Sequence, residues 1–340
     1  MRRLLSRTLT IAALALAGCG REAANAPSAP AAQAAAPSAG TPADAKADPA
    51  PLAIAAIFDE GGAFSEGLAP VRVGARFGYI DKQGKIAIEP QFDFAGAFSE
   101  GLAAAGAGPK TGYIDKQGMF VLLPKLEIVD LFAFSEGLAP VRIGEYLTGK
   151  WGYIDKQGKL AIKPQFDRAG SFSDGLAVVS VGDKYGYIGK DGKFAIPLQF
   201  ASASSFSEGL ASVRQGDFVT GKDGYIDKSG KLVIAPAFEA AFPFHDGLAE
   251  IQLGGKYGYI GKDGKIVIPP NFDFADSFSG GLAAVRMGDA ETGKYGYIGK
   301  DGKIAIPPRY DFADLFSASD GLAAVRIGDE KNGKFGYIAR

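Results

Sequence analysis

The sequence predicts an all-β protein made of eight tandem units of roughly 36 residues, each an antiparallel β-hairpin or three-stranded sheet. A Gly-Tyr-Ile core recurs eight times at intervals of 34 to 40 residues. Short apolar segments flank each core, and turn residues separate them. Because a unit this small cannot bury a core alone, successive units must pack on one another. We expect a propeller-like closed ring, with an open β-solenoid as the alternative.

The three segments of a unit each have the pattern of a short strand. In residues 281–287, alternation places Val285 and Arg286 on opposite faces of an extended strand. The second segment, as in residues 151–154, places two aromatic rings on one face with glycine opposite, and glycine there usually marks a close backbone approach. The third segment, as in residues 265–268, is rich in the β-branched residues that strands prefer.

Turn residues join the second and third segments. Residues 81–84 read Asp-Lys-Gln-Gly, which fits a type I turn followed by a glycine in the left-handed region. Three later units read Gly-Lys-Asp-Gly instead, so their single carboxylate lies two positions further on. One acid per turn cannot supply the roughly six to eight oxygens that calcium takes. We therefore predict hairpin turns and no metal loops.

The last part of each unit allows two structures. An aromatic-acid pair such as Phe92-Asp93 follows a proline, and then come Ala-x-x-Phe and Ser-Glu-Gly. Proline interrupts the preceding strand. The Ala-x-x-Phe segment is either one helical turn stopped by glycine or a short fourth strand.

The phase of the repeats bears on closure. Residues 52–67 align with residues 86–101, so the array begins at a third segment and ends at a second segment, residues 335–338. The N-terminal segment would then complete the eighth unit. A ring closed by pairing its two ends requires this phase, and closure would remove exposed sheet edges.

The unit resembles the WG repeat family of bacterial β-repeat proteins. The matching features are the aromatic-Gly-Tyr-Ile core, the Lys-x-Gly-Lys turn and Phe-Ser-Glu-Gly-Leu-Ala, over residues 52–340. The tryptophan that names the family occurs only at Trp151, and Thr111 and Asp223 replace the aromatic residue in the second and fifth units. We expect those two units to pack less well. The resemblance implies a repeat scaffold and supplies no catalytic residue.

The N-terminal residues predict export and lipidation. Residues 1–18 have a positive start and a short apolar run, which is typical of a signal peptide. Leu16-Ala17-Gly18-Cys19 resembles the lipobox of bacterial lipoproteins, which implies cleavage before Cys19 and acylation of that residue. Residues 19–50 are rich in alanine and proline and are expected to form a disordered tether. Residues 51–340 form the repeat domain.

The lipobox also implies where the protein is located. Acyl chains on Cys19 would hold the chain on a membrane. Gly20, rather than aspartate, follows the cysteine, and by resemblance this favours the outer membrane, facing the periplasm or the cell surface. Cys19 is the only cysteine, so an intramolecular disulfide is excluded.

Composition argues against several functions. The net charge is −1 with interspersed signs, which does not predict nucleic-acid binding. The only histidine, His245, is expected to be an exposed turn residue, and sites built from several histidines or cysteines are excluded by count. We predict no catalytic residue, cofactor or metal site. A hydrolase with a carboxylate pair is the least favoured alternative, because the acids recur at equivalent positions in the units.

An arginine row is the candidate binding surface. Five units carry arginine at the same position of the first segment: Arg72, Arg142, Arg214, Arg286 and Arg326. In a stacked array these residues would lie along one surface and could meet a polyanion or an acidic protein. The alternative is local pairing with an acid of the repeat, such as Glu66 or Asp93.

We therefore favour a non-enzymatic, membrane-anchored scaffold that binds another envelope protein. Carbohydrate or polyanion binding through exposed tyrosine rings and the arginine row is the alternative. Links of variable length join the first and second segments, as near Phe218, Glu291 and Lys331, and we expect them to protrude as loops.

Overall fold

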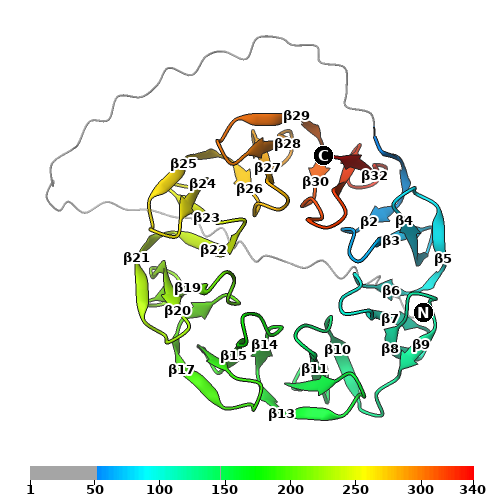
Figure 1. The fold of residues 1–340 in the computed structure, drawn as a ribbon, viewed down its shortest axis with the longest axis horizontal. Coiled ribbons are helices and arrows are strands. Elements are labelled where there is room, and N and C mark those ends of the chain that lie inside the picture. The colour runs from blue at the N-terminus through cyan, green and yellow to red at the C-terminus, as the bar shows by residue number, and fades with distance from the viewer. Residues whose placement is uncertain (1–51, 146) are drawn as a thin grey trace, which may run out of the picture. The chain divides into compact units, whose positions relative to one another are not determined.

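The computed structural model describes residues 52–145 and 147–340. The predicted signal peptide, Cys19 and the tether lie outside these residues. Every regular element in the described part of the chain is a β-strand, and no helix occurs there. The strands form eight four-stranded sheets, one for each repeat, arranged around a ring (Figure 1). This arrangement is an eight-bladed β-propeller, so the prediction of an all-β closed ring is confirmed.

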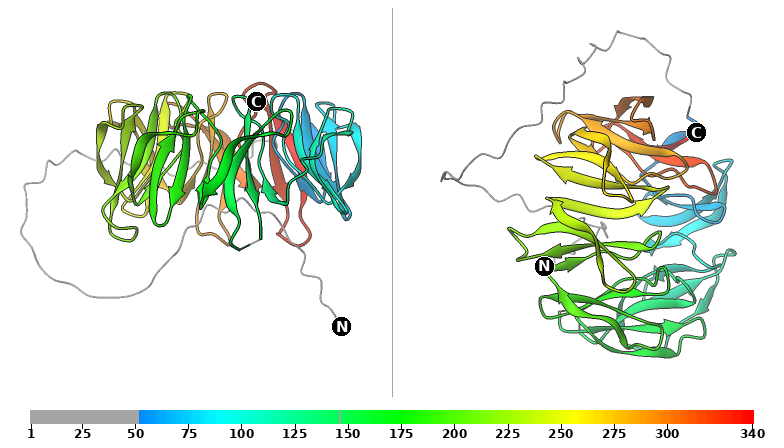
Figure 2. Two further views of the ribbon diagram at one scale, coloured as in Figure 1. Left: turned by 90° about the horizontal axis from the view of Figure 1, so that it is seen from below. Right: turned by 60° about the vertical axis from the view of Figure 1, so that its left-hand side comes forward.

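Each blade runs from a short inner strand to a longer outer strand. In blade 1 the order is β2 (Glu60–Gly61), β3 (Leu68–Val73), β4 (Arg76–Asp81) and β5 (Ile86–Phe92). Figure 1 shows the short first strands near the centre of the ring and the fourth strands along its perimeter. Figure 2 shows the same ring edge-on, with the strands crossing its thickness.

The other blades repeat this order. Blade 2 contains β6 (Phe94–Ala95), β7 (Ala103–Ala107), β8 (Lys110–Ile114) and β9 (Phe120–Leu122); blade 3 contains β10 (Ile128–Leu131), β11 (Leu138–Ile143), β12 (Lys150–Asp155) and β13 (Leu160–Phe166). Blade 4 contains β14 (Arg168–Ala169), β15 (Ala177–Val181), β16 (Lys184–Ile188) and β17 (Phe194–Phe200); blade 5 contains β18 (Ser202–Ala203), β19 (Leu210–Gln215), β20 (Lys222–Asp227) and β21 (Leu232–Phe238). Blade 6 contains β22 (Ala240–His245), β23 (Leu248–Leu253), β24 (Lys256–Gly261) and β25 (Ile266–Phe272); blade 7 contains β26 (Phe274–Ala275), β27 (Leu282–Met287), β28 (Lys294–Gly299) and β29 (Ile304–Tyr310).

Blade 8 joins the two ends of the repeat domain. It contains β30 (Phe312–Ala313), β31 (Leu322–Ile327), β32 (Lys334–Ala339) and, as its outer strand, the N-terminal β1 (Ile54–Phe58). In this antiparallel pair Ile54 faces Tyr337 and Phe58 faces Phe335. The ring is therefore closed as the phase of the repeats predicts, and the open solenoid is excluded.

The segment that the sequence left open contains no helical turn: a two-residue strand ends at its alanine, and the residues up to the phenylalanine are irregular in blade 2. In blade 2, Phe94 and Ala95 pair with Gly106 and Ala105. The following Ser-Glu-Gly forms a tight two-residue hairpin: in blade 1 the backbone groups of Ser65 and Leu68 bond to each other, while Glu66 and Gly67 both have positive φ, 53° and 87°. Two successive left-handed residues are typical of a type I′ turn.

The predicted Asp-Lys-Gln-Gly turn is confirmed. Gly84 donates its N–H to the Asp81 carbonyl at 2.9 Å and has a φ of 79°. The Asp81 carboxylate accepts the N–H groups of Gln83 at 3.0 Å and Lys85 at 2.9 Å. The side chain is thus used within its own turn.

A buried tyrosine crosses the seam between each blade and the next. Tyr79 of blade 1 donates its hydroxyl to the Gly96 carbonyl of blade 2 at 2.7 Å, and its ring centroid lies 4.9 Å from that of Phe98. At the closing seam Tyr337 donates to the Gly62 carbonyl at 2.9 Å. In the described residues all eight seams have this bond, from Tyr79, Tyr113, Tyr153, Tyr187, Tyr225, Tyr259, Tyr297 and Tyr337.

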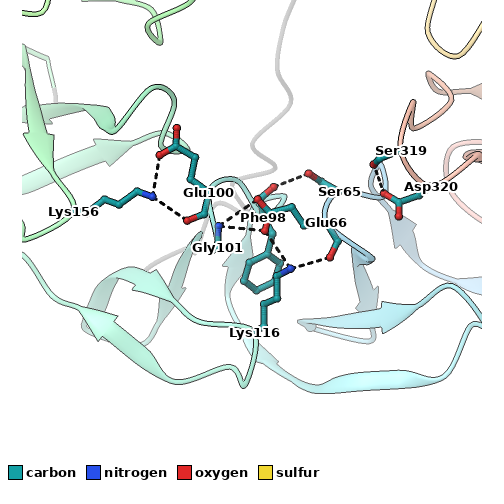
Figure 3. A network of polar contacts seen from close by, with 9 residues as sticks. All are labelled: Ser65, Glu66, Phe98, Glu100, Gly101, Lys116, Lys156, Ser319 and Asp320. Atoms are coloured by element: carbon teal, nitrogen blue, oxygen red, sulfur yellow. Dashed lines mark hydrogen bonds and ion pairs between the residues drawn. The ribbon is translucent and has the colours of Figure 1, made fainter.

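In the blades other than blade 7, where glycine (Gly280) takes its place, the acid of the hairpin adds a second seam contact, as Figure 3 shows for Glu66 and Glu100. The Glu66 carboxylate accepts the Gly101 N–H of the next blade at 3.2 Å and pairs with Lys116 at 3.2 Å. The same contacts recur with Glu100 and Lys156 (Figure 3). A left-handed backbone is unfavourable for glutamate, so these inter-blade bonds offset a local strain. Where the ring closes, Asp320 pairs with Lys82 at 2.6 Å.

The glycine of each core lets the outer strand approach. A Cβ added to Gly78 would lie 2.5 Å from the Ile88 carbonyl oxygen and 2.8 Å from the Pro90 nitrogen. The predicted close backbone approach is therefore present, and the core glycine is required by space rather than by a left-handed φ.

Two hollows lie in or beside the degenerate units, and the looser packing of these units stays a prediction. An open groove of about 330 Å³ lies between the outer strand of blade 2 and blade 3. A smaller cavity of about 110 Å³ lies at the inner part of blade 5, where Asp223 replaces the aromatic residue.

We predict that Gly78→Ala destabilises the protein by about 1–3 kcal/mol, because its Cβ meets backbone atoms that cannot move freely. Gly96→Ala is the matched control: its Cβ would be 3.6 Å from the nearest atom, so its effect should stay within about 0.5 kcal/mol. Urea denaturation of the two variants measures the difference. Equal stability of the two variants would contradict the proposed packing of the core glycine.

Candidate binding surface

The arginine row lies near one end of the ring. Each arginine is the residue before the last of its blade's second strand, as Arg72 is in β3. Arg72 faces Glu60 of the inner strand and Phe77 of the third strand. The row is therefore next to the links that join second and third strands. We call this end of the ring the link face.

Three of the five arginines are neutralised by a carboxylate. These pairs are Arg72 with Glu60, Arg142 with Asp130, and Arg214 with Asp223. The local-pairing alternative is therefore correct for these three, but with other partners than expected: Glu66 pairs with Lys116, and Asp93 with Arg76. Each of these carboxylates lies directly opposite its arginine on a neighbouring strand. This strand register cannot be read from the positions of the residues in the sequence.

Arg286 and Arg326, in adjacent blades, face aromatic rings instead of acids. Arg286 is opposite Phe274, and Arg326 is opposite Phe312. The Arg286 guanidinium carbon lies 5.7 Å from the centroid of the Tyr295 ring, within the range of a cation–π contact. The Nε atoms of both arginines are buried without a hydrogen-bond partner in the described residues.

No carboxylate in the described chain forms an ion pair with these two arginines. Asp273 and Asp311, two acids of the same blades, pair with Lys256 and Lys294 instead. Hydrogen bonds from Lys256 and from the Gly288 N–H hold the pKa of Asp273 below its usual range. Two cationic side chains thus remain available on the link face of blades 7 and 8.

A half-buried aromatic band connects these arginines across blades 6 to 8. Its members alternate between inner and third strands: Phe242, Tyr257, Phe274, Tyr295, Phe312 and Phe335. Consecutive ring centroids are 5.7 to 6.5 Å apart, and their planes are tilted by 40° to 65°. We call this band, together with Arg286 and Arg326, the arginine–aromatic surface.

The expectation of exposed tyrosine rings is wrong for the core tyrosines. All eight are at most 1% exposed, and their hydroxyls are used in the seams. Burial raises the pKa of Tyr79 far above its ordinary value. The physical reason is that the face bearing the core tyrosine is the face covered by the next blade. Among the tyrosines of residues 52–145 and 147–340, only those at the preceding aromatic position, such as Tyr257 and Tyr295, are half-exposed.

One buried acid and two half-buried acids lie close to the band, and our sequence reasoning missed them. Glu250 of β23 is 4% exposed, and burial together with the charge of Asp276 raises its pKa well above the ordinary value. Burial also raises the pKa of Asp276, and it raises that of Asp314 to about 6. Glu250 occupies a position that holds proline, alanine, valine or serine in the other units, and this departure is the signal that could have identified it.

The cavity in blade 5 is lined by serines and by Arg214, whose guanidinium group already donates hydrogen bonds within the protein. Arg214 donates to Asp223 at 2.7 Å and to the Phe218 carbonyl at 2.8 Å, and Asp223 accepts the Ala241 N–H at 2.9 Å. At about 110 Å³ the space is smaller than the roughly 300 Å³ of a small-molecule pocket. Arg214 is therefore part of the blade's internal bonding.

The links at this face are held by aspartates. In blade 5 the Asp217 carboxylate accepts the N–H groups of Val219 and Thr220 at 2.8 and 2.7 Å. Phe218 and Val219 are exposed, as predicted for a protruding link. Asp289 in blade 7 and Asp329 in blade 8 hold their links in the same way.

The described residues offer few side chains for acid–base catalysis or metal binding. His245 is exposed at the end of β22, as expected. Among residues 52–145 and 147–340, no three His, Cys, Asp or Glu side chains are grouped to hold a metal ion. A search of the same residues found no helix with the length and apolarity needed to cross a membrane.

A family model described as "WG containing repeat" matches eight consecutive segments: residues 52–76, 77–105, 112–146, 151–185, 185–217, 224–257, 257–289 and 295–330. No curated protein matches the chain by sequence.

Solved structures resemble the chain in fold at low identity. A crystal structure of the eukaryotic initiation factor has a TM-score of 0.51 and 12% identity, covering 77% of this chain and 78% of that one. Hsv2p of Kluyveromyces lactis has a TM-score of 0.44 and 11% identity, covering 83% and 96%. PorZ of Porphyromonas gingivalis has a TM-score of 0.43 and 10% identity, covering 80% and 42%. Only the first of these supports the fold.

We predict that Asp314→Asn stabilises the protein at neutral pH. A folded-state pKa of about 6, against 3.8 in the unfolded chain, means that the native state binds more protons between these values. Stability from this group therefore falls as pH rises from about 4 to 6. The variant removes that loss, so the free energy of unfolding should rise by up to about 3 kcal/mol at pH 8 and change little at pH 4.

Asp273→Asn is the control with the opposite sign. Lysine holds the pKa of this acid down, so the variant should lower stability at pH 7. Urea denaturation between pH 4 and 8 measures both variants. An Asp314→Asn protein that is less stable than wild type at pH 8 would contradict the burial assigned to this carboxyl.

Proposed function

The chain belongs to the WG repeat family, and from this premise we propose that it is a non-enzymatic interaction scaffold of the bacterial envelope, held to a membrane through lipidated Cys19. A propeller of repeats is consistent with a protein-interaction scaffold. The partner is another envelope protein, and its binding site is the arginine–aromatic surface of blades 6 to 8.

The observation that carries this proposal is the contrast within the arginine row. Arg72 and Arg142 each have a carboxylate partner, whereas Arg286 and Arg326 lie on aromatic rings without one. A carboxylate supplied by a partner would complete the missing charge-assisted hydrogen bonds. Arginine and large aromatic residues are also the side chains that most often dominate binding energy at protein interfaces.

The geometry of the band favours a protein over a sugar chain. Neighbouring rings are tilted by 40° to 65°, so they do not form one flat platform on which sugar rings could stack. We therefore place an acidic segment of a partner protein here and treat a polyanionic glycan as an outcome of the test.

The absence of catalysis is part of the proposal. The repeated acids bond to backbone N–H groups of turns and seams, as Asp81 and Glu66 do. The single histidine is exposed at a hairpin. These uses support a structural role for the acids and leave the hydrolase as the least supported alternative.

We predict that Arg286→Gln combined with Arg326→Gln lowers partner recovery at least tenfold in affinity capture from detergent-solubilised membranes. Arg72→Gln is the matched control, because it changes the same repeat position where a carboxylate already neutralises the charge. Quantitative mass spectrometry of the captured proteins gives the readout.

Two results would contradict this assignment. One is equal recovery of the partner by the double variant and the wild type. The other is a double variant that loses binding to sulfated glycans but keeps its protein partner, which would assign the surface to a polyanion.

Anchoring through Cys19 has a separate test. We predict that Cys19→Ala abolishes incorporation of labelled fatty acid and moves the protein out of the membrane fraction, because each buried methylene of an acyl chain contributes roughly 0.8 kcal/mol to membrane binding. Acyl label retained by the variant would disprove lipidation at this residue.

A further inference from the structure

The outer edge of blade 2 departs from the edges of the other blades. In six blades a lysine follows the turn glycine: Lys85, Lys159, Lys193, Lys231, Lys265 and Lys303. Blade 2 has Met119 at this position, and Leu123 stands where blades 1 and 3 have Glu89 and Lys163 and where blades 4 to 7 have proline or alanine. The substitutions replace charge by apolar surface at one rim of the ring.

These apolar residues are on the outside. Met119, Val121 and Leu123 are 64%, 55% and 46% exposed. Val121 lies in β9 and Met119 and Leu123 flank it directly, so these three exposed side chains form an apolar row at this rim. Charged residues and prolines normally protect such a rim from pairing with other chains. Pro124 is retained, but the charges are lost.

The strand itself is short. β9 has three residues, whereas the outer strands of blades 1 and 3 to 7 have seven. It pairs with β8 only through Leu122 with Tyr113 and Phe120 with Ile114. The other edge of β9 has no partner strand in the described residues, so its backbone groups face outward.

A groove with two lysines lies at the end of this row. It has a volume of about 330 Å³ and is lined by Leu122, Leu123, Pro124, Lys125, Gln157, Gly158 and Lys159. No acid lines it, and within the described residues neither lysine forms an ion pair. The groove is therefore apolar at one side and positively charged at the other.

We propose that the rim of blade 2 is a second docking surface, which binds an extended peptide segment with alternating apolar residues and a carboxylate at its end. The peptide backbone pairs with the free edge of β9, as in recognition by β-strand addition. Its apolar side chains pack on Met119, Val121 and Leu123. Its carboxylate binds between Lys125 and Lys159.

This site is independent of the arginine–aromatic surface, because it lies on the outer strand of another blade and uses none of the same residues. It adds a second partner-binding surface to the proposed scaffold, so one protein could hold two partners. Loss of binding at one surface should leave the other unchanged.

The test titrates the full chain with a short acetylated peptide of alternating threonine and valine that has a free C-terminal carboxylate. Backbone amide NMR shifts report binding. We expect saturable shifts confined to residues 119–125 and 157–159. The same peptide with a C-terminal amide should bind several-fold more weakly. The peptide with the free carboxylate should also bind several-fold more weakly to the variant Lys125→Gln combined with Lys159→Gln.

Variants that restore the repeat's own residues provide a sharp control. Met119→Lys with Leu123→Glu should weaken peptide binding at least tenfold, because it removes two of the three apolar side chains of the row. The variant is expected to fold, since blade 1 has Lys85 and Glu89 at these positions. Val121→Ala introduces the alanine that blade 1 has at this position, Ala87. It is a milder second variant and should weaken peptide binding several-fold. Val267→Ala on the rim of blade 6 and Arg286→Gln should leave binding unchanged.

Four results would overturn the proposal: no saturable shifts at these residues, equal peptide binding by the restored variant, a dimer that forms with rising concentration and is lost in the restored variant, or binding of this rim to vesicles of anionic phospholipid. The third would assign the surface to a second copy of the chain. The fourth would assign it to a membrane.

Discussion

The interaction on which the ring depends is the hydrogen bond of a buried tyrosine across each seam. The Tyr79 hydroxyl reaches a carbonyl of the next blade, and its ring packs on Phe98 of that blade. A buried hydroxyl left without a partner would cost about 1–3 kcal/mol. Each blade is therefore stable only when the next blade places a carbonyl group within hydrogen-bond distance of this hydroxyl. The same requirement applies at the last blade, where Tyr337 finds Gly62 only if the chain closes on its own N-terminal segment. Closure follows from a contact repeated in every unit.

Uniform seams leave the remaining positions free to differ, and these differences carry the candidate functions. The arginine position is not part of the tyrosine bond across the seam, so it is neutralised in blade 1 and left facing an aromatic ring in blades 7 and 8. The rim of blade 2 is likewise free to differ, and there Met119 takes the place of the lysine found in six other blades. Glu250 shows the limit of this freedom: it lies next to a seam, where its charged form is disfavoured by burial.

Local features of this fold could be predicted from sequence, and those that depend on distant partners could not. The Asp81 turn, the close approach at Gly78 and the shared phase of the two ends are set by neighbouring residues or by the repeat itself. The partner of an arginine depends on register between strands: Glu60 lies 12 residues before Arg72 and pairs with it through β2, a strand of two residues that the sequence did not distinguish from a helical turn. Alternation correctly grouped the two aromatic residues of the second segment on one face. It does not reveal that the next blade covers Tyr259 and leaves Tyr257, at the link-face end of the same row, half-exposed.

Native-state hydrogen exchange of the closing blade tests the central claim most directly. If the ring is closed by the same contacts as every other seam, the paired amides of β1 and β32 exchange only through global unfolding, with the same free energy as those of β4 and β12 in interior blades. Exchange from β1 at a much lower free energy, while β4 and β12 remain protected, would show that the ends separate independently and would contradict the account.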